Sequence, residues 1–353
     1  MNVLTILRSV EELLYEVISW LLFYPRTLWM TVMRPLRTMR YSDSEQRDRP
    51  EQQYLETLSP PLFLVLSILL AHGAELAFGL DVERGTSALG RLVTGNEQAL
   101  LAFHRGLEPK VMARVPEQFS LLPRAGFEVR AVEPWRAQSA AGGSYMRPSG
   151  DGSRPGVFYV NSYDLPTRKT WDAEDLFLHE AIPGHHFQLA LQQELEGLPA
   201  FRRYGGETAF TEGWGLYAES LGRELGLYQD PYSYFGYLQN ELWRAIRLVV
   251  DTGLHHKGWS RQQVIEYMLE NSASSRTDAV AEAERYMAIP GQALAYKIGE
   301  LKIKQLRRKA QASLGPRFDP RDFHAQVLKD GSVPLDVLEA KIDAWIAATQ
   351  AAE

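Results

Sequence analysis

The sequence contains no cysteine among its 353 residues. A disulfide framework, a thiolate metal site and a cysteine nucleophile are therefore excluded. The absence does not indicate a compartment, since a chain without thiols is compatible with either redox environment. Histidine, aspartate and glutamate remain as metal ligands, and these residue types suit zinc or a similar divalent ion.

The sequence also lacks an excess of charge of one sign, internal repeats and long low-complexity segments. Its formal net charge is −6, with both signs dispersed, whereas nucleic-acid-binding proteins usually present a basic face. We therefore expect no nucleic-acid partner. The length allows two or three domains, and the apolar content of 45% is sufficient for a core. Without a basic n-region or a small-residue cleavage site at the start, no signal peptide is expected.

Two apolar runs occupy residues 13–33 and 61–79. A membrane-spanning helix needs ~20 mostly apolar residues, and both runs are borderline because Pro25 interrupts the first and His72 and Glu75 interrupt the second. We expect membrane association through these runs; the alternative is two buried helices of a soluble domain. If both runs span the bacterial inner membrane, the basic loop between them lies in the cytoplasm and the C-terminal part is periplasmic.

These patterns predict a membrane-associated helical segment at 1–97 and a soluble, mainly helical domain at 98–353. The alternating segment FEVRAV and the segment GVFYVN predict two strands, which we expect to form a small antiparallel β-hairpin. The Gly-, Ser- and Pro-rich stretch between them predicts a loop. The strands and loop are expected at residues 127–132, 156–161 and 137–155, and helices at 98–114, 171–195, 207–226, 231–256, 260–270, 277–287, 291–313 and 335–350.

The octapeptide HEAIPGHH, which begins at His179, resembles an opened HExxH motif. In HExxH, two histidines one helical turn apart bind zinc, and the glutamate acts on a water molecule. Here Glu180 keeps its place, but Pro183 stands where the second histidine is expected, and histidines follow only at His185 and His186. A proline within the expected helix predicts a kink or a π-type bulge.

Helix geometry favours His185 over His186 as the second ligand. In a regular helix His186 returns to the face of His179, but ~10 Å further along the axis, which is too far to share one ion easily. His185 is closer and needs only the bulge to reach that face. His186 remains the alternative ligand. Histidines that merely cap or line a polar groove are disfavoured, because three lie within eight residues beside Glu180.

A third ligand is expected from the segment TEGWGLYAE, in which Glu212 and Glu219 lie two turns apart on one helix face. Glu212 follows His185 by 27 positions, a spacing that suits the next helix of an antiparallel pair. Glu219 is the alternative ligand, or would orient a histidine. Gly213 and Gly215 reduce helix stability, but they allow the close approach of a second backbone that a metal site between two helices requires.

Together these segments resemble the DUF885 family of bacterial proteins, which are zincin-like and related in pattern to the helical metallocarboxypeptidases. The resemblance covers about residues 100–350. It rests on HEAIPGHH, TEGWGLYAE, FEVRAVEP at 127–134, DGSRPGVFYVNSYDLP at 151–166 and RYMAIPGQALAYKIG at 285–299. Family members usually have a large helical N-terminal half before these motifs. Residues 1 to about 97 instead resemble the start of a bacterial membrane protein.

The resemblance implies a zincin-like helical metallopeptidase domain that binds Zn²⁺, with Glu212 as third ligand. It implies that GVFYVN, with Tyr159 and Asn161, holds an extended peptide by backbone pairing. It also implies a tyrosine, Tyr286 or Tyr296, that donates a hydrogen bond to the tetrahedral oxyanion. For each tyrosine the alternative is core packing with a hydrogen bond at the ring tip.

Three arginines, Arg147, Arg276 and Arg285, are candidates for binding a substrate carboxylate, and Lys297 is a weaker one. We therefore expect a zinc-dependent hydrolase of the carboxypeptidase or dipeptidase type, acting on a peptide or small amide with Glu180 as base. One alternative is an amidase or esterase on a non-peptide metabolite. The other is a membrane-anchored, inactive pseudoenzyme, which a glutamate ligand far from the histidine pair would favour.

Overall fold

The computed structural model describes residues 96–165 and 168–352, together with 22–31, 33, 38, 41, 54, 57–59, 62, 63, 66, 67 and 70. The chain divides into two compact units, residues 1–90 and 91–353. All predicted metal-binding, catalytic and substrate-binding residues lie in the second unit.

In the first unit, the described parts of the two apolar runs contact each other. The hydroxyl of Tyr24 donates to Ser67 Oγ at 3.1 Å, and its ring centroid lies 5.3 Å from that of Phe63. No helix among the described residues is long and apolar enough to cross a membrane. The two predicted spanning helices therefore find no support. Much of both runs, including His72 and Glu75, lies outside the described residues.

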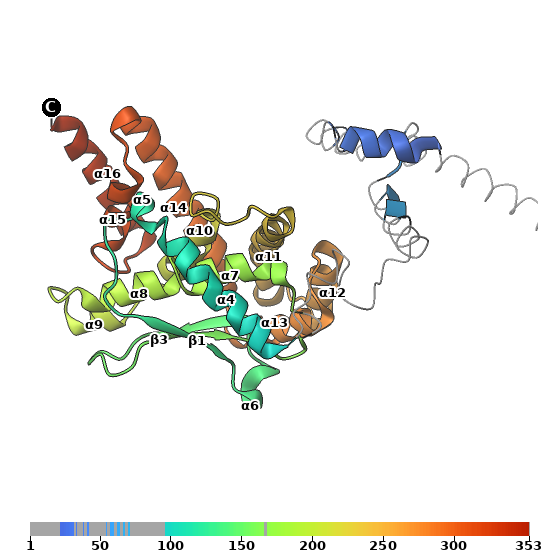
Figure 1. Cartoon of the computed structure of the whole chain (residues 1–353), viewed down its shortest axis with the longest axis horizontal. Coiled ribbons are helices and arrows are strands. Elements are labelled where there is room, and N and C mark those ends of the chain that lie inside the picture. Colours follow the sequence, from blue (N-terminus) through green and yellow to red (C-terminus); the bar gives the residue numbers. More distant parts are fainter. Residues whose placement is uncertain are drawn as a thin grey trace, which may run out of the picture. The chain divides into compact units, whose positions relative to one another are not determined.

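The second unit is mainly helical, as predicted, and its strands gather at one side beside α4, α7 and α8 (Figure 1). The strands are β1 (Phe127–Ala131), β2 (Gly143–Met146) and β3 (Gly156–Val160). The helices are α4 (Glu97–Met112), α5 (Val115–Gln118), α6 (Pro134–Ala137), α7 (Ala173–Glu180), α8 (His185–Glu194), α9 (Ala200–Tyr204), α10 (Thr208–Ser220), α11 (Pro231–His255), α12 (Arg261–Asn271), α13 (Arg276–Ala288), α14 (Gln292–Leu314), α15 (Pro320–Leu328) and α16 (Leu335–Ala351), with short 3₁₀ turns η5 (Thr170–Asp172) and η6 (Gly315–Arg317). Helix α15 and the short helices α5, α6 and α9 were not predicted from the sequence.

The sheet differs from the predicted hairpin. Its strand order is β1-β3-β2, and the two predicted strands, β1 and β3, pair in parallel with Phe127 opposite Gly156. The antiparallel partner of β3 is β2, which lies within the stretch predicted as a loop. The predicted pairing was therefore wrong. Because the connection from β1 to β3 contains α6 and β2, the chain enters β3 in its original direction, whereas a direct hairpin would reverse it.

The single helix predicted over residues 171–195 is instead two helices, α7 and α8. Pro183 has no N–H to donate to a continuing helix. A Cβ atom at Gly184 would lie 1.9 Å from the carbonyl oxygen of His179, so the chain can turn here only at a glycine. The indole N–H of Trp214 in α10 donates to the Pro183 carbonyl at 2.8 Å, so a hydrogen bond joins the segment between α7 and α8 to α10. A complete break thus replaces the expected bulge.

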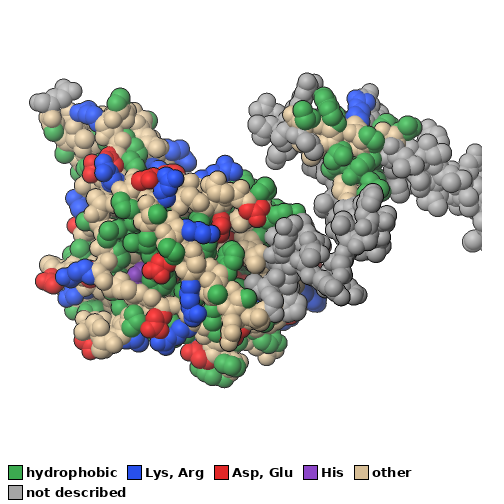
Figure 2. Space-filling view, in the orientation of Figure 1, with side chains coloured by type: hydrophobic (Ala, Val, Ile, Leu, Met, Phe, Trp, Pro, Cys, Tyr) green, Lys and Arg blue, Asp and Glu red, His purple; other side chains and the backbone are tan. Residues whose placement is uncertain are grey.

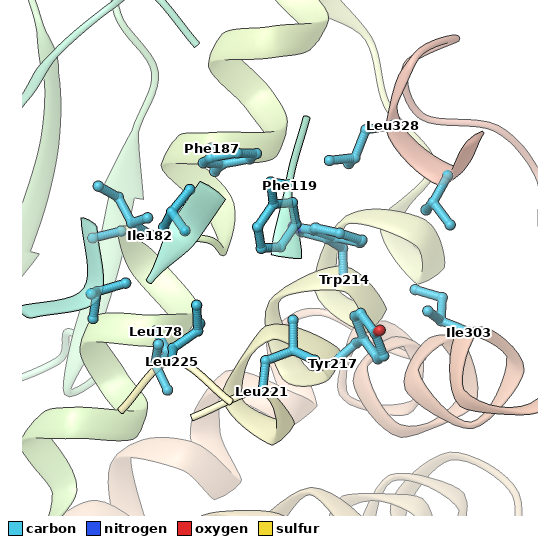
Figure 3. Close-up of a cluster of buried hydrophobic side chains, with 14 of the residues drawn as sticks. Phe119, Leu178, Ile182, Phe187, Trp214, Tyr217, Leu221, Leu225, Ile303 and Leu328 are labelled. Atoms are coloured by element: carbon cyan, nitrogen blue, oxygen red, sulfur yellow. The ribbon is translucent and has the colours of Figure 1, made fainter. Parts of the chain in front are cut away.

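The main core holds α8, α10 and α14 in place. Figure 3 shows Phe119, Phe187 and Trp214 gathered in it, with Phe119 4.9 Å from Phe187 and 6.2 Å from Trp214 between ring centroids. Burial of each such side chain contributes ~1.5–3 kcal/mol. A Cβ at Gly213 would lie 2.4 Å from the Cα of Gly299, so α10 and α14 approach each other closely, as predicted from the glycines.

The surface of the second unit carries charges of both signs. Figure 2 shows Lys and Arg side chains interspersed with Asp and Glu over the visible face. Several form ion pairs, such as Arg114 with Glu117 at 3.2 Å. Such pairs between exposed groups contribute little to stability, ~0–1 kcal/mol each.

Candidate functional site

Three of the predicted metal ligands meet where α7, α8 and α10 come together. His179 belongs to α7, His185 is the first residue of α8, and Glu212 lies in α10. One ligand atom from each lies within 4.8 Å of the other two. Glu212 Oε2 is 3.2 Å from His185 Nε2 and 3.7 Å from His179 Nε2. Ligands ~2.0–2.1 Å from a tetrahedral zinc ion lie roughly 3.4 Å apart, so this spacing fits such an ion.

Several buried polar atoms of this group have no hydrogen-bond partner among the described residues. They are Nδ1 of His185, Oε2 of Glu180 and Oε2 of Glu212. An unpartnered buried polar atom costs ~1–3 kcal/mol, more when it is charged. The free carboxylate oxygen between two imidazoles therefore fits a bound cation. Because Glu212 lies within reach of both histidines, the separation that would favour an inactive site is not observed.

Glu219 orients His179 from the side opposite to Glu212. Its Oε1 lies 2.7 Å from His179 Nδ1 and accepts a hydrogen bond from Arg244 Nη2 at 3.3 Å. A metal-binding histidine usually has a carboxylate or carbonyl on its other ring nitrogen, which fixes the ring. Gly215 makes room for this ring, because a Cβ there would lie 2.7 Å from it. Of the two roles predicted for Glu219, the geometry matches the orienting one.

Carboxylates and burial control the protonation of the site. Burial opposes the charge on His179, but the neighbouring carboxylates of Glu212 and Glu219 raise its pKa to about 9. Burial also opposes ionisation of Glu212, yet the two histidines hold its pKa well below the usual range. Burial raises the pKa of Glu180. A cation at the centre would displace protons from the imidazoles, since only neutral histidine binds metal.

His186 lies outside this group. Its Nδ1 is 2.8 Å from the hydroxyl of Tyr145, and its ring is 4.8 Å from that of Phe127. Burial lowers the pKa of His186 to about 4, so this histidine is neutral. Adjacent residues on a helix point ~100° apart. The restart of the helix at His185 therefore decides which of the two histidines faces Glu212.

A cavity of about 430 Å³ opens beside the group. His179, Glu180 and Tyr296 line it, together with Gly143 from β2 and Arg247 from α11. Small-molecule sites are typically clefts of ~300–1,000 Å³ with a few convergent polar groups. The cavity therefore has room for a short segment of substrate next to the His179–Glu180 pair.

Tyr296, one of the two tyrosines considered for the oxyanion, adjoins the group of His179, His185 and Glu212. Its ring stacks on that of His179 with centroids 5.9 Å apart. The side-chain amide of Gln292 donates both to the Tyr296 hydroxyl at 3.1 Å and to Glu212 Oε1 at 3.0 Å. The hydroxyl is thus held next to the Glu212 carboxylate.

Tyr286 has a different environment. It is 1% exposed, and its hydroxyl accepts from Arg247 Nε at 2.7 Å and donates to Glu282 Oε2 at 2.6 Å. Its ring belongs to a second core, with Trp243 and others from α11, α12 and α13. This hydroxyl is committed to an arginine–glutamate network and is not among the cavity-lining groups.

Two of the predicted substrate-binding residues, Asn161 and Arg285, line the cavity. The Asn161 amide donates to the carbonyl of Ala137 at 2.8 Å, so it holds the loop before β2. Lys297 does not reach the cavity, because its ammonium pairs with Glu241 at 2.7 Å.

The other three predicted substrate-binding residues lie away from the cavity. Arg147 donates to the Tyr204 carbonyl at 2.7 Å, and the ring of Tyr159 lies 4.9 Å from the Arg136 guanidinium. Arg276 is exposed at the start of α13. Sequence proximity to a motif did not bring these side chains to the site.

Sequence reasoning missed Arg244 and Arg247, which both line the cavity. They lie three residues apart in α11, among the buried residues Trp243, Ile246 and Val250. Arginine is seldom fully buried unless it is paired. Two arginines one turn apart within an apolar helix face were therefore the available signal.

The predicted peptide-binding strand, GVFYVN, is the central strand β3. With β1 on one edge and β2 on the other, its backbone groups are already paired, so the expectation that it binds a peptide is wrong. An unpaired edge is what an added strand needs. Strand β2 has such an edge among the described strands, and a Cβ at Gly143 would lie 2.7 Å from the Leu176 side chain of α7.

Fold and site thus define a mainly helical protein with a buried His–His–Glu group beside a cavity. The chain belongs to the DUF885 family, described as "Bacterial protein of unknown function", which it matches over residues 84–342. No curated protein matches it.

Two solved structures are similar to the chain. One is described as "the putative lipoprotein from Colwellia psychrerythraea", with 37% identity, a TM-score of 0.71 and coverage of 92% of this chain. The other, from Shewanella oneidensis, is described as "a putative lipoprotein of unknown function", with 21% identity, a TM-score of 0.62 and coverage of 90%. The chain spans 55% of the length of each. The second likeness shows the fold alone.

Proposed function

We propose that the protein is a zinc-dependent, zincin-like hydrolase that cleaves peptide or small amide bonds. His179, His185 and Glu212 would hold the ion. The observation that carries the proposal is that these three residues lie together beside a cavity, which Glu180 also lines with a buried, unpartnered carboxylate oxygen. When bound, zinc would supply a Lewis acid that activates water and polarises the scissile carbonyl.

Glu180 is the general base in this proposal. Its Oε2 is free of protein partners and the residue lines the cavity. It accepts a proton from the attacking water, whose oxygen bonds to the carbonyl carbon, and passes a proton to the leaving amine as the C–N bond breaks. Burial raises the pKa of Glu180 towards the range in which a carboxylate exchanges protons efficiently near neutral pH.

Tyr296 and β2 complete the arrangement. The Tyr296 hydroxyl, fixed by Gln292 beside Glu212, donates to the developing oxyanion. A donor of this kind contributes ~3 kcal/mol in the transition state. The outer edge of β2, rather than β3, pairs with an extended substrate by strand addition. A non-peptide amide or ester would use the same residues, and hydrolysis of a peptide library compared with a small amide panel separates these substrates.

We also propose that the protein works at a membrane. Both similar structures carry the description "putative lipoprotein". The N-terminal region of this chain carries two apolar runs. Fractionation of the source cells tests this: recovery of the protein in the soluble fraction alone would contradict it.

The decisive experiment combines metal content with hydrolysis. We expect about one zinc ion per purified chain, retained in Glu180→Gln and lost in Glu212→Gln. Glu117→Gln, which removes only an ion pair between exposed groups, is the matched control. In zinc-loaded Glu180→Gln, hydrolysis should fall by about 10²–10⁴-fold. Full hydrolytic activity in that variant, or equal zinc content in Glu212→Gln and wild type, contradicts the proposal.

A further inference from the structure

Arg247 is a buried guanidinium with one unused nitrogen in the cavity wall. The residue is 6% exposed. Its Nε donates to the Tyr286 hydroxyl at 2.7 Å and its Nη2 to Glu282 Oε2 at 2.9 Å, whereas Nη1 has no partner among the described residues. Leaving a buried donor unpaired is costly. The free nitrogen therefore indicates an acceptor that arrives with a ligand.

The charge around Arg247 is incompletely compensated. Arg285, from α13, donates to both carboxylate oxygens of Glu282, at 3.1 and 2.8 Å. Two guanidinium groups thus share one carboxylate, which leaves one positive charge on the cluster. A single anionic group would neutralise it, and a carboxylate matches the planar donors of arginine.

Each of the other two cavity arginines pairs with a different carboxylate. Arg168 pairs with Asp278 at 3.1 Å, and Arg244 pairs with Glu219 at 3.3 Å. The uncompensated charge in the arginine-lined wall therefore lies at Arg247 and Arg285.

Arg247 lies one aromatic ring away from the metal-binding group. Its Cζ is 4.4 Å from the ring centroid of Tyr296, and the imidazole of His179 is 5.9 Å from the same centroid. The two distances together place the guanidinium within about 10 Å of the imidazole. An extended chain spans ~3.3–3.6 Å per residue. One or two residues therefore fit between a bond cleaved beside His179 and a carboxylate at Arg247.

We propose that Arg247, positioned by Glu282 and Arg285, binds the C-terminal carboxylate of a peptide substrate. Cleavage then falls one or two residues from the C-terminus. The inference rests on the proposed function, because it names the substrate end that the same cavity accepts. In this proposal Arg247 binds the carboxylate and Arg285 helps to position Arg247, whereas Arg147 and Arg276 do not take part.

The kinetic test uses a set of N-acetyl tripeptides, each with a free C-terminal carboxylate and as its C-terminal amide. In zinc-loaded wild type, kcat/KM should be about 10- to 100-fold higher for the acids, the range for a hydrogen bond to a charged group. Arg247→Gln should lose this preference, because its kcat/KM should fall by about 10- to 100-fold more for the acids than for the amides. Arg261→Gln, an exposed arginine paired with Glu284, is the matched control and should behave as wild type.

The second readout needs no turnover. Calorimetric titration of metal-free protein with N-acetylphenylalanine and with its amide compares binding of the same probe with and without the carboxylate. The acid should bind at least about 10-fold more weakly to Arg247→Gln than to wild type, and the amide equally to both. If Arg247→Gln does not fold, Arg247→Lys decides: it keeps the charge but loses the planar donors, so it should show an intermediate preference for acids. An unchanged preference overturns the proposal.

The outcomes separate this inference from the proposed function. Equal hydrolysis of acids and amides by wild type overturns the carboxylate subsite while the hydrolase proposal stands. Binding of the acid that depends on Arg247, without hydrolysis of any peptide by zinc-loaded protein, supports the subsite and contradicts the hydrolase.

Discussion

The molecule buries histidine in two regions and satisfies it in opposite ways. In the main core, His324 lies between neutral groups, with Nε2 2.7 Å from the Tyr217 hydroxyl and Nδ1 2.7 Å from the Gln118 carbonyl oxygen. Near the cavity, His179 lies between two carboxylates. Burial lowers the pKa of His324 to about 3, whereas the carboxylates overcome burial and raise the pKa of His179 to about 9.

The comparison shows that burial of a histidine does not by itself indicate function. Both rings are almost inaccessible to solvent, but both ring nitrogens of His324 have partners, whereas Nδ1 of His185 and Oε2 of Glu180 and Glu212 have none among the described residues. The core histidine has hydrogen-bond partners for both ring nitrogens within the protein. The site group has buried atoms that lack partners in the described part of the chain, and a bound cation would supply one. We therefore expect pH to change the stability that the His324 region contributes. We expect metal to change the properties of the region that contains His179.

The largest effect is expected from two adjacent histidines within the site region. His185→Gln removes a proposed ligand and should weaken zinc binding by more than about 100-fold, beyond the range for loss of a supporting residue. His186→Gln should retain wild-type zinc content, because His186 contacts Tyr145 instead. Elemental analysis after dialysis against a chelator measures both. The reverse pattern would mean that His186 is the ligand.

In the core region, His324→Ala should lower the free energy of unfolding by about 3 kcal/mol. It removes a packed ring and leaves the Tyr217 hydroxyl and the Gln118 carbonyl unpaired. Zinc content should not change. Chemical denaturation with a parallel metal assay tests this, and loss of zinc without loss of stability would remove the contrast between the two regions.

Glu219→Gln tests the support of His179. The amide keeps the shape of the side chain but loses the charge, so zinc affinity should fall by about 10- to 100-fold. A competition titration with a fluorescent chelator gives the affinity, and Glu117→Gln serves again as the surface control. An unchanged affinity would show that Glu219 is structural.

The smallest effect is the pH dependence of stability from the core. Below the ordinary pKa of 6.5, the unfolded chain takes up a proton at His324, while the folded chain does so only near the pKa of about 3. The free energy of unfolding therefore decreases as the pH falls across that interval, by about 1 kcal/mol between pH 6 and pH 5 for this histidine. Denaturation of His324→Phe over the same range should show a shallower slope, and an unchanged slope contradicts the prediction.

Helix positions were predictable where local signals mark them. Ser260 and Gln263 form a reciprocal capping box, and α12 begins at Arg261, directly after Ser260 and close to the predicted start at 260. Asp230 caps α11 next to a proline at its first position. These signals act within three or four residues, so they can be recognised in the sequence without knowledge of the fold.

Strand pairing could not be predicted in the same way. The residues of β2 are GSYM, within a stretch whose composition is typical of a loop. This segment becomes a strand because it pairs with β3 and packs against Leu176 of α7. Its identity depends on distant partners. The assignment of β3 as the peptide-binding edge failed for the same reason.

The sequence by itself determined the types and order of the proposed ligands and the need for glycine between helices. HEAIPGHH and TEGWGLYAE carry these features within short segments, where backbone geometry limits what each residue can do. Only the tertiary structure decided that His185 rather than His186 faces Glu212, and that Arg247 reaches the same cavity. Those outcomes follow from how α7, α8, α10, α11 and α14 pack together, and long-range packing is not encoded in any single local pattern.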